Sequence, residues 1–112
     1  MAKEHLTQGT IRVNMMLTLT RAERREFDAL SAADLRTPGQ MATRIVLTHL
    51  AQRTTNASVG PISPGERIAR SLPIRLTPVQ RRELKARARR DGRTLSNYVT
   101  TLVIRTIAAQ RP

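Results

Sequence analysis

The sequence predicts a mainly α-helical fold in which a strand followed by two helices occurs twice, in the order β-α-α-β-α-α. Two observations support this prediction. A shift of about 57 positions aligns Leu19-Thr20 with Leu76-Thr77, and Arg24-Arg25-Glu26 with Arg81-Arg82-Glu83, without a gap. Within each repeat, apolar residues first recur at every second position and then at every third or fourth. The chain therefore consists of two copies of one unit.

Each repeat opens with a predicted strand that has one apolar face. In the first repeat, apolar residues at alternate positions are Ile11, Val13, Met15, Leu17 and Leu19. In the second they are Leu72, Ile74 and Leu76. Alternation of this kind is typical of a strand that buries one face. Because the shift between the repeats keeps apolar positions apolar, we expect the two strands to present equivalent faces.

A helix is expected directly after each strand. Thr20 with Glu23, and Thr77 with Gln80, have the spacing of a capping box, in which the two side chains satisfy backbone N–H groups at the helix start. Pro78 adds a proline in the first turn, where its missing N–H costs nothing. We expect these helices over 21–34 and 78–91.

The second helix of each repeat is predicted to begin after Thr37 and after Thr94. Gly92 suits the left-handed end of the preceding helix. Leu35 stands at the equivalent place in the first repeat, so we expect that turn to close differently. The buried stripes of the second helices are predicted from residues at three-to-four spacing: Met41, Ala42, Ile45, Val46 and Leu50, and then Tyr98, Val99, Leu102, Val103 and Ile107.

These patterns divide the chain into four segments. An N-terminal tail covers 1–10, the first repeat 11–53, a linker rich in Asn, Ser, Gly and Pro 54–69, and the second repeat 70–112. A strand followed by two helices buries too little apolar surface to be stable alone. We therefore expect the two repeats to form one folded unit.

The charge of the chain favours a polyanionic partner. The net charge is +12, from 20 Lys and Arg against 8 Asp and Glu, and the pI is about 11.9. Phe27 and Tyr98 are the only aromatic residues, so few side chains are available to stack on unpaired bases. Double-stranded DNA is thus favoured over single strands.

The composition also suggests the setting of the protein. There is no cysteine, and no apolar stretch has the length needed to cross a bilayer. The N-terminal residues are polar and do not have the pattern of a signal peptide. We expect a soluble, cytoplasmic protein with no membrane partner.

The order of strand, capped helix, turn and capped helix resembles the ribbon-helix-helix superfamily of the Arc, MetJ and CopG repressors. The second repeat is the closer match, through Leu72-Pro73-Ile74-Arg75-Leu76-Thr77 and Gly92-Arg93-Thr94-Leu95-Ser96. The resemblance implies that the two strands pair in an antiparallel β-ribbon over four interlocked helices. With both units in one chain, it implies an intramolecular pseudo-dimer, similar to the tandem conjugation proteins of the TraY type.

The resemblance also implies which residues read bases in the major groove, since they lie on the polar strand face: Asn14, Met16, Thr18, Ser71, Pro73 and Arg75. The alternative is an ordinary solvated strand face. Met16 and Pro73 depart from the polar residues expected at the middle of this face. Proline also removes a ladder donor, so it is tolerated in one register only, unless the second strand is short or frayed.

Phosphate contacts are expected at the starts of the second helices and beside the strands. The candidates are Arg12, Thr37, Gly39, Gln40, Arg93, Thr94, Ser96 and Asn97. Helix capping alone is the alternative for the threonines, and both roles are compatible.

The positive charge is uneven, since the second repeat carries a basic cluster on its first helix that either touches flanking phosphates or is simply solvated. The cluster consists of Arg81, Arg82, Lys85, Arg87, Arg89 and Arg90. Unequal strands and uneven charge predict an asymmetric DNA site.

Other function classes have less support. His5 and His49 are the only histidines, and His49 falls within a predicted core helix, where a structural role is more common than a catalytic one. No phosphate-binding glycine loop, metal cluster or nucleophile motif is present, so we expect no enzyme activity, cofactor or metal. An antitoxin would need a longer segment than Gln110 to Pro112 after the last helix, and a nonspecific nucleic-acid-binding assembly protein remains open.

Within DNA binding, the sequence leaves two roles. One is a transcriptional repressor, and the other is an accessory factor of the relaxosome in conjugative transfer, which would act with a relaxase. In either role, further copies of the chain on DNA are possible partners.

Overall fold

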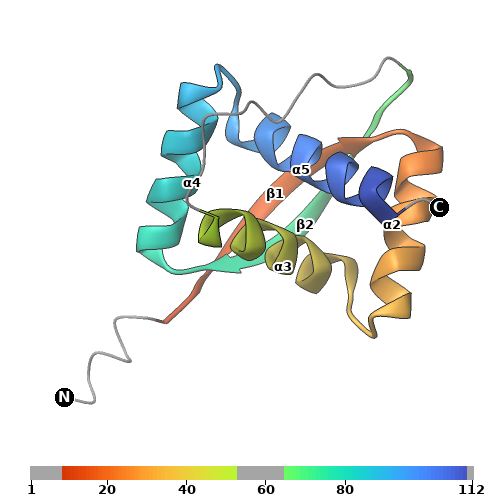
Figure 1. Cartoon of the computed structure of the whole chain (residues 1–112), viewed down its shortest axis with the longest axis horizontal. Coiled ribbons are helices and arrows are strands. Elements are labelled where there is room, and N and C mark those ends of the chain that lie inside the picture. Colours follow the sequence, from red (N-terminus) through yellow and green to blue (C-terminus); the bar gives the residue numbers. More distant parts are fainter. Residues whose placement is uncertain (1–8, 53–64, 111–112) are drawn as a thin grey trace.

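The computed structural model describes residues 9–52 and 65–110, and the element order agrees with the sequence prediction (Figure 1). The elements are β1 (Ile11–Leu19), α2 (Arg21–Ala33), α3 (Pro38–Ala51), β2 (Ile68–Leu76), α4 (Pro78–Arg90) and α5 (Leu95–Gln110). The second strand begins at Ile68, so the predicted linker boundary at residue 69 is corrected, because Ile68 and Ala69 already pair with β1. Most of the predicted N-terminal tail, His5 and residues 54–64 of the predicted linker lie outside the described residues.

The two strands form an antiparallel ribbon whose register reflects the repeat. Met15 pairs with Leu72, Ile11 with Leu76, and Leu19 with Ile68. Met15 and Leu72 occupy the same position of their repeats, and the pairs on either side exchange equivalent positions. The two halves of the ribbon are thus related by an approximate two-fold axis through the Met15–Leu72 pair.

All four helices lie on one side of the ribbon, and the second helices cross between the repeats. Helix α3 of the first repeat packs on β2, and α5 of the second packs on β1. Figure 1 shows α3 and α5 lying over the ribbon, with α2 and α4 at opposite sides. Each repeat therefore completes its core with the other. No helix in 9–52 or 65–110 has the length and apolar character needed to cross a membrane.

The core follows most of the predicted apolar positions, except that Ile11 is exposed and Val13 and Leu50 are only partly buried. From the strands it contains Met15, Leu17, Leu19, Leu72, Ile74 and Leu76, and from the helices Phe27, Leu84, Val46, Val99 and Val103 are also buried. The capping boxes are confirmed at Thr20 and Thr77, so the strand-to-helix transitions occur where the sequence predicts them. Thr37 caps α3 as expected and forms a further capping box with Gln40.

The turn between α2 and α3 corrects one expectation. Leu35 was expected to close this turn differently from Gly92, but it adopts the same left-handed backbone, with φ of 57° against 70° for Gly92. The closing bonds are equivalent, since Arg36 N donates to Ser31 O at 2.9 Å and Arg93 N to Ala88 O at 3.0 Å. Tertiary structure thus imposes on a leucine a conformation that costs roughly 1–2 kcal/mol for most residues.

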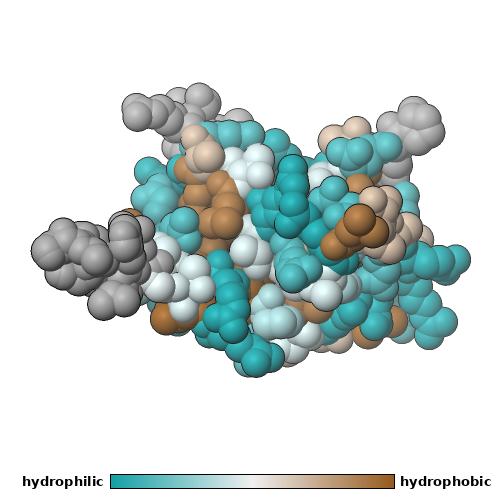
Figure 2. All heavy atoms as spheres, turned by 90° about the horizontal axis from the view of Figure 1, so that it is seen from below, coloured by the Kyte–Doolittle hydropathy of each residue, from teal (hydrophilic) through white to brown (hydrophobic). Residues whose placement is uncertain are grey.

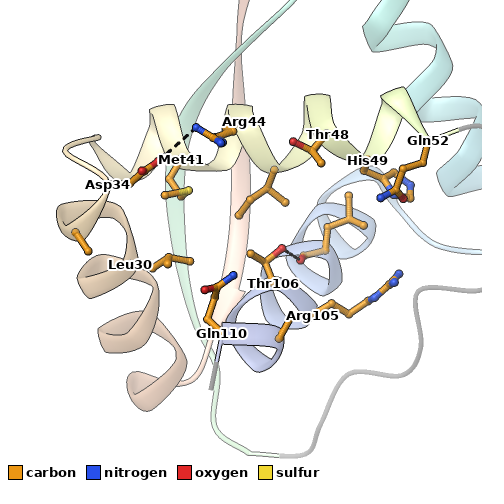
Figure 3. A pocket seen from close by; sticks show the side chains of 14 residues that line it. Leu30, Asp34, Met41, Arg44, Thr48, His49, Gln52, Arg105, Thr106 and Gln110 are labelled. Carbon is orange, nitrogen blue, oxygen red and sulfur yellow. Dashed lines mark hydrogen bonds and ion pairs between the residues drawn. The ribbon is translucent and has the colours of Figure 1, made fainter. Parts of the chain in front are cut away.

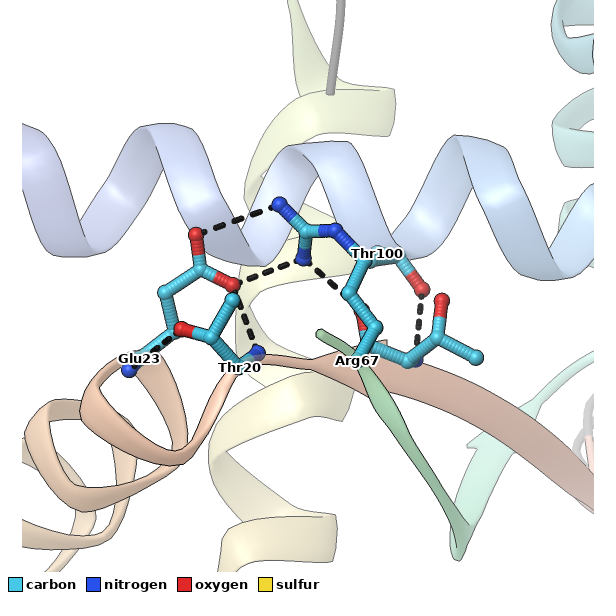
Figure 4. A network of polar contacts seen from close by, with 5 residues as sticks. Thr20, Glu23, Arg67 and Thr100 are labelled. Carbon is cyan, nitrogen blue, oxygen red and sulfur yellow. Dashed lines mark hydrogen bonds and ion pairs between the residues drawn. The ribbon is translucent and has the colours of Figure 1, made fainter. Parts of the chain in front are cut away.

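A largely buried ion pair ties the start of β2 to the first repeat (Figure 4). Arg67 Nη1 lies 2.7 Å from Glu23 Oε1 and also donates to Thr18 O at 3.0 Å. The same Glu23 oxygen accepts from Thr20 N at 3.0 Å in the capping box. One carboxylate therefore caps α2 and holds the chain that enters the second strand.

A second cross-repeat contact involves Arg87 of α4. Its guanidinium donates to the carbonyls of His49 at 2.9 Å, Leu50 at 3.3 Å and Gln52 at 3.1 Å. These carbonyls lie at the C-terminal end of α3, where the N–H partners of a continuing helix are missing, although His49 O also accepts from Gln52 N at 3.1 Å. Arg87 therefore satisfies the end of a helix in the other repeat.

Candidate nucleic-acid interface

The face of the ribbon away from the helices carries the side chains predicted to read bases. The outward pairs are Arg12 with Arg75, Asn14 with Pro73, Met16 with Ser71, and Thr18 with Ala69. All are exposed except Thr18, which is partly buried. Met16 keeps 45% of its surface exposed near the middle of the face. The structure thus brings all six predicted base-reading residues onto one surface.

Arg12 and Arg75 face each other across the strands at one end of this surface. None of the ion pairs formed among the described residues includes either guanidinium. Like charges directly opposite each other on a ribbon are destabilising. This end of the ribbon is therefore electrostatically suited to an anionic partner.

The register explains how Pro73 is accommodated. Arg75 N donates to Thr43 Oγ1 at 3.2 Å, so its N–H points out of the ladder and toward α3. Because strand N–H groups alternate in direction, the nitrogen of Pro73 lies on the same outer edge. Pro73 therefore removes no ladder bond, and β2 continues unbroken through it, which corrects the alternative of a short or frayed strand.

The bond from Arg75 has a symmetric counterpart that the sequence analysis missed. Thr18 N donates to Thr100 Oγ1 at 3.3 Å, and Thr18 and Thr100 are the repeat equivalents of Arg75 and Thr43. Threonine is identical at this position in both repeats. That identity was the available signal, because a hydroxyl repeated at the same position beside apolar helix residues indicates a specific bond.

The start of α3 packs closely against the ribbon. A Cβ added to Gly39 would lie 2.7 Å from Pro73 O, so glycine is required by this approach. Thr37 and Gln40 are exposed, and they already bond to each other's backbone N–H. Gly39 was predicted to contact phosphate, but it is buried. Its structural role is to let α3 approach β2 closely.

An open depression lies between the ribbon and the start of α3. It is lined by Arg12, Pro73 and Arg75 from the ribbon side and by Thr37, Gly39 and Gln40 from the helix, with Arg36 and Arg44 nearby. Asp34 pairs with Arg36 at 2.6 Å and lies 3.6 Å from Arg44. With four arginines and this one aspartate in its lining, the depression keeps a net positive charge beside the first turn of α3, where helix N–H groups favour anions.

The start of α5 is less basic. Thr94 Oγ1 accepts from Asn97 N at 3.1 Å, and Ser96 lies beside Met15 with a contact of 3.8 Å to its sulfur. Arg93 pairs with Asp91 at 2.8 Å, and its side chain is only 19% exposed. Because Arg93 is paired with Asp91 and mostly buried, little of its side chain is available to bind a phosphate.

The basic cluster on α4 divides into buried and exposed members. Arg87 is only 7% exposed and caps α3, so it is removed from the residues predicted to touch phosphates or to be solvated. Arg90 lies 3.8 Å from Glu83. Arg81, Arg82, Lys85 and Arg89 are exposed.

A second depression lies between α2, α3 and α5 and includes no residue of either strand (Figure 3). His49 lines it, with its Nε2 2.7 Å from the hydroxyl of Tyr98. Burial, and then the charges of Arg87 and Arg105, lower the pKa of His49 from its ordinary value. His49 thus packs as a neutral ring against a tyrosine, away from the outer ribbon face.

The side of the molecule that lies at the bottom in Figure 1 is mostly polar. Figure 2 shows hydrophilic residues over most of this side, with hydrophobic residues in separate groups. Within the described part of the chain, no three His, Asp or Glu side chains gather as a metal site would require.

Comparisons with known proteins add no relative. No protein-family model matches the chain, and neither a curated protein nor a solved structure matches it. The functional argument therefore depends on the geometry of the ribbon and its surroundings.

Proposed function

We propose that this chain is a sequence-specific double-stranded DNA-binding protein that inserts its β-ribbon into the major groove. The observation that carries the proposal is the outer ribbon face, with Arg12 opposite Arg75 at one end and Asn14, Met16 and Ser71 exposed beside its centre. Two strands lie about 4.8 Å apart, and a ribbon of this width fits a groove about 12 Å wide.

The exposed side chains have the chemistry that base edges require. Arginine donates two hydrogen bonds to the O6 and N7 of guanine, and asparagine pairs with the edge of adenine. Met16 provides an apolar surface for a thymine methyl group. Arg75 and Asn14 are thus the principal candidates for reading hydrogen-bond patterns, and Met16 for reading thymine.

The proposal includes the tandem ribbon-helix-helix arrangement, a pseudo-dimer within one chain. It is supported by the pairing of equivalent positions about Met15 and Leu72 and by the exchange of α3 and α5 between the repeats. Because one chain supplies both strands, one chain suffices for one ribbon, as in the tandem proteins of the TraY type.

Equivalent positions on the outer face differ between the two strands. Arg12 corresponds to Ala69, Asn14 to Ser71, Met16 to Pro73, and Thr18 to Arg75. The two halves of the ribbon therefore offer different groups to the two halves of a site. We propose a target that is not palindromic.

The starts of α3 and α5 are proposed to hold the phosphates on either side of the groove. Thr37 and Gln40 at one end, and Thr94, Ser96 and Asn97 at the other, lie at helix N-termini where N–H groups favour anions. Such contacts position the protein without reading sequence.

The biological role proposed is repression of a promoter or support of a relaxase at an origin of transfer. Both roles use the same ribbon, and both allow further copies to bind along the DNA. The genomic position of the site distinguishes them.

Selection of bound duplexes from a random pool tests the proposal, with the molar mass of the protein measured in the same preparation. We expect a short asymmetric motif bound by a monomeric chain. Recovery of no motif would contradict base reading by the ribbon and favour nonspecific nucleic-acid binding.

A further inference from the structure

The two ends of the ribbon differ in how their arginines are neutralised. At the end where β1 finishes and β2 begins, Arg67 pairs with Glu23 at 2.7 Å and Arg70 with Asp28 at 3.0 Å. At the opposite end, Arg12 and Arg75 belong to none of the ion pairs among the described residues. The ribbon therefore has a basic end and a neutralised end.

Helix α4 begins at the basic end. Leu76 is the last residue of β2, Thr77 caps α4, and Pro78 is its first residue. Figure 1 shows α4 rising from this end of the ribbon, with α2 on the other side of the molecule. The surface of α4 is thus continuous with the Arg12–Arg75 end.

Three exposed cations recur at every fourth position of α4: Arg81, Lys85 and Arg89. We call them the α4 stripe. Residues four apart lie about 6 Å from one another along a helix, and no ion pair between described residues includes these three. The equivalent positions of α2 hold Arg24, Asp28 and Ala32, so α2 has no such stripe.

The α4 stripe points away from the helix layer. Arg87 reaches into that layer, where it contacts the end of α3. Lys85 and Arg89 are each two positions from Arg87, so they lie about 160° from it around the helix. The three side chains of the stripe are therefore clear of the core and exposed to solvent.

We propose that the α4 stripe binds phosphates of the duplex beyond the ribbon site, on the Arg12–Arg75 side only. DNA is then held with a fixed polarity, with longer contact on the α4 side. This inference rests on the proposed DNA-binding function. It is supported by charge complementarity and by continuity between the stripe and the basic end of the ribbon.

The test uses three duplexes built on the selected motif: a minimal duplex, and two duplexes extended by about one helical turn, roughly 10 bp, on one side or the other. Binding is measured for the wild-type chain and for two charge-matched triple variants. One variant removes the stripe (Arg81→Gln, Lys85→Gln, Arg89→Gln). The other removes three exposed arginines from α2 (Arg21→Gln, Arg24→Gln, Arg25→Gln). Glutamine keeps a good helix propensity in both, and circular dichroism confirms folding.

We expect extension on one side alone to tighten wild-type binding, by about ten-fold at low salt. The α4 variant should lose this gain, whereas the α2 variant should keep it. Because the two variants are matched in charge, their affinities for the minimal duplex should be similar. Equal gains in affinity from both extensions would overturn the inference while leaving motif recognition intact. Equal effects of the two variants on that gain would do the same. Failure of the wild-type chain to select a motif would instead overturn the proposed function, and the inference with it.

Discussion

Met15 and Leu72 face each other across the ribbon and occupy the same position in the two repeats. Both are buried, so the approximate two-fold axis passes through a packed apolar pair. The outward pairs on either side of it, Asn14 with Pro73 and Met16 with Ser71, are then exchanged positions that carry different side chains. A symmetric core thus supports an asymmetric outer surface.

Arg75 and Thr94 should contribute to DNA binding in different ways. Arg75→Ala removes a proposed guanine contact, so it should lower the preference for cognate over random DNA, by about 1–3 kcal/mol at one base pair. Thr94→Ala removes a group proposed to position a phosphate-binding helix start, so it should weaken binding to both DNAs more evenly. Titration of each variant with cognate and random duplexes measures the difference. Equal losses on both DNAs for both variants would contradict these roles.

Gly39→Ala should destabilise the protein, because the new Cβ would lie 2.7 Å from Pro73 O. Overpacking of this kind typically costs about 1–3 kcal/mol. The matched control is Ser96→Ala, since Ser96 is the repeat equivalent of Gly39 and already has a Cβ. Urea unfolding should show a clear loss for the first variant and a change below about 0.5 kcal/mol for the second. Similar stability of both variants would mean that the approach of α3 to Pro73 is loose.

Leu35→Gly should stabilise the protein. Leu35 is 92% exposed and has a φ of 57°, so the substitution relieves backbone strain and loses little packing. Part of the relief is offset by the entropy of glycine in the unfolded chain, which leaves a gain of up to about 1 kcal/mol. Gly92→Leu places leucine at the equivalent turn, where no atom lies within 4 Å of the new Cβ. Thermal unfolding should shift upward for the first variant and downward for the second, and shifts in the same direction would exclude backbone strain as the cause.

Arg87→Leu should be among the most destabilising single substitutions in α4. It removes the guanidinium that now bonds to the carbonyls of Leu50 and Gln52, and it leaves His49 O with Gln52 N as its donor. This loss should cost about 2–4 kcal/mol. Arg90→Gln is the control, because Arg90 makes only an exposed contact with Glu83 at 3.8 Å and should cost less than about 0.5 kcal/mol. Denaturant midpoints compare the two. An equally small loss for Arg87→Leu would mean that water replaces the guanidinium at the end of α3.

His49 should make stability fall on mild acidification. Its pKa in the folded protein is lowered from 6.5, first by burial and then by Arg87 and Arg105. The unfolded chain therefore takes up a proton at a higher pH than the folded chain. The stabilisation is fully present above about pH 6.5 and is lost as the pH falls through the lower folded pKa. His49→Gln should reduce the difference in unfolding free energy between about pH 7.5 and 5.5, and an unchanged difference would assign it to other groups.

Much of the fold follows from local sequence signals. Alternating apolar residues define both strands. The capping boxes at Thr20 and Thr77 and the capping threonine Thr37 predict the starts of α2, α4 and α3, which the structure confirms. The turn at Leu35 does not follow from local preference, because packing of α2 and α3 outweighs the strain of one residue. The start of β2 was also placed too late, because Ile68 and Ala69 pair with Leu19 and Thr18 of β1, partners that are distant in sequence.

The outer ribbon face was predictable from the same alternation, and all six proposed base-reading residues lie on it. The roles of individual arginines were not predictable. Arg87 is buried against the end of α3 in the other repeat, and Arg67 is held by Glu23 of α2. Both partners are distant in sequence, so only the tertiary structure separates these internal arginines from the exposed ones.

Replacement of single atoms in the selected DNA motif tests major-groove reading by the ribbon most directly. Substitution of 7-deazaguanine for guanine removes the N7 acceptor, and uracil for thymine removes the methyl group, both in the major groove. Inosine for guanine removes the amino group in the minor groove. We predict that the first two replacements weaken binding by about ten-fold at contacted positions and that inosine leaves it nearly unchanged. A loss with inosine alone, or with none of the three, would contradict insertion of the ribbon into the major groove.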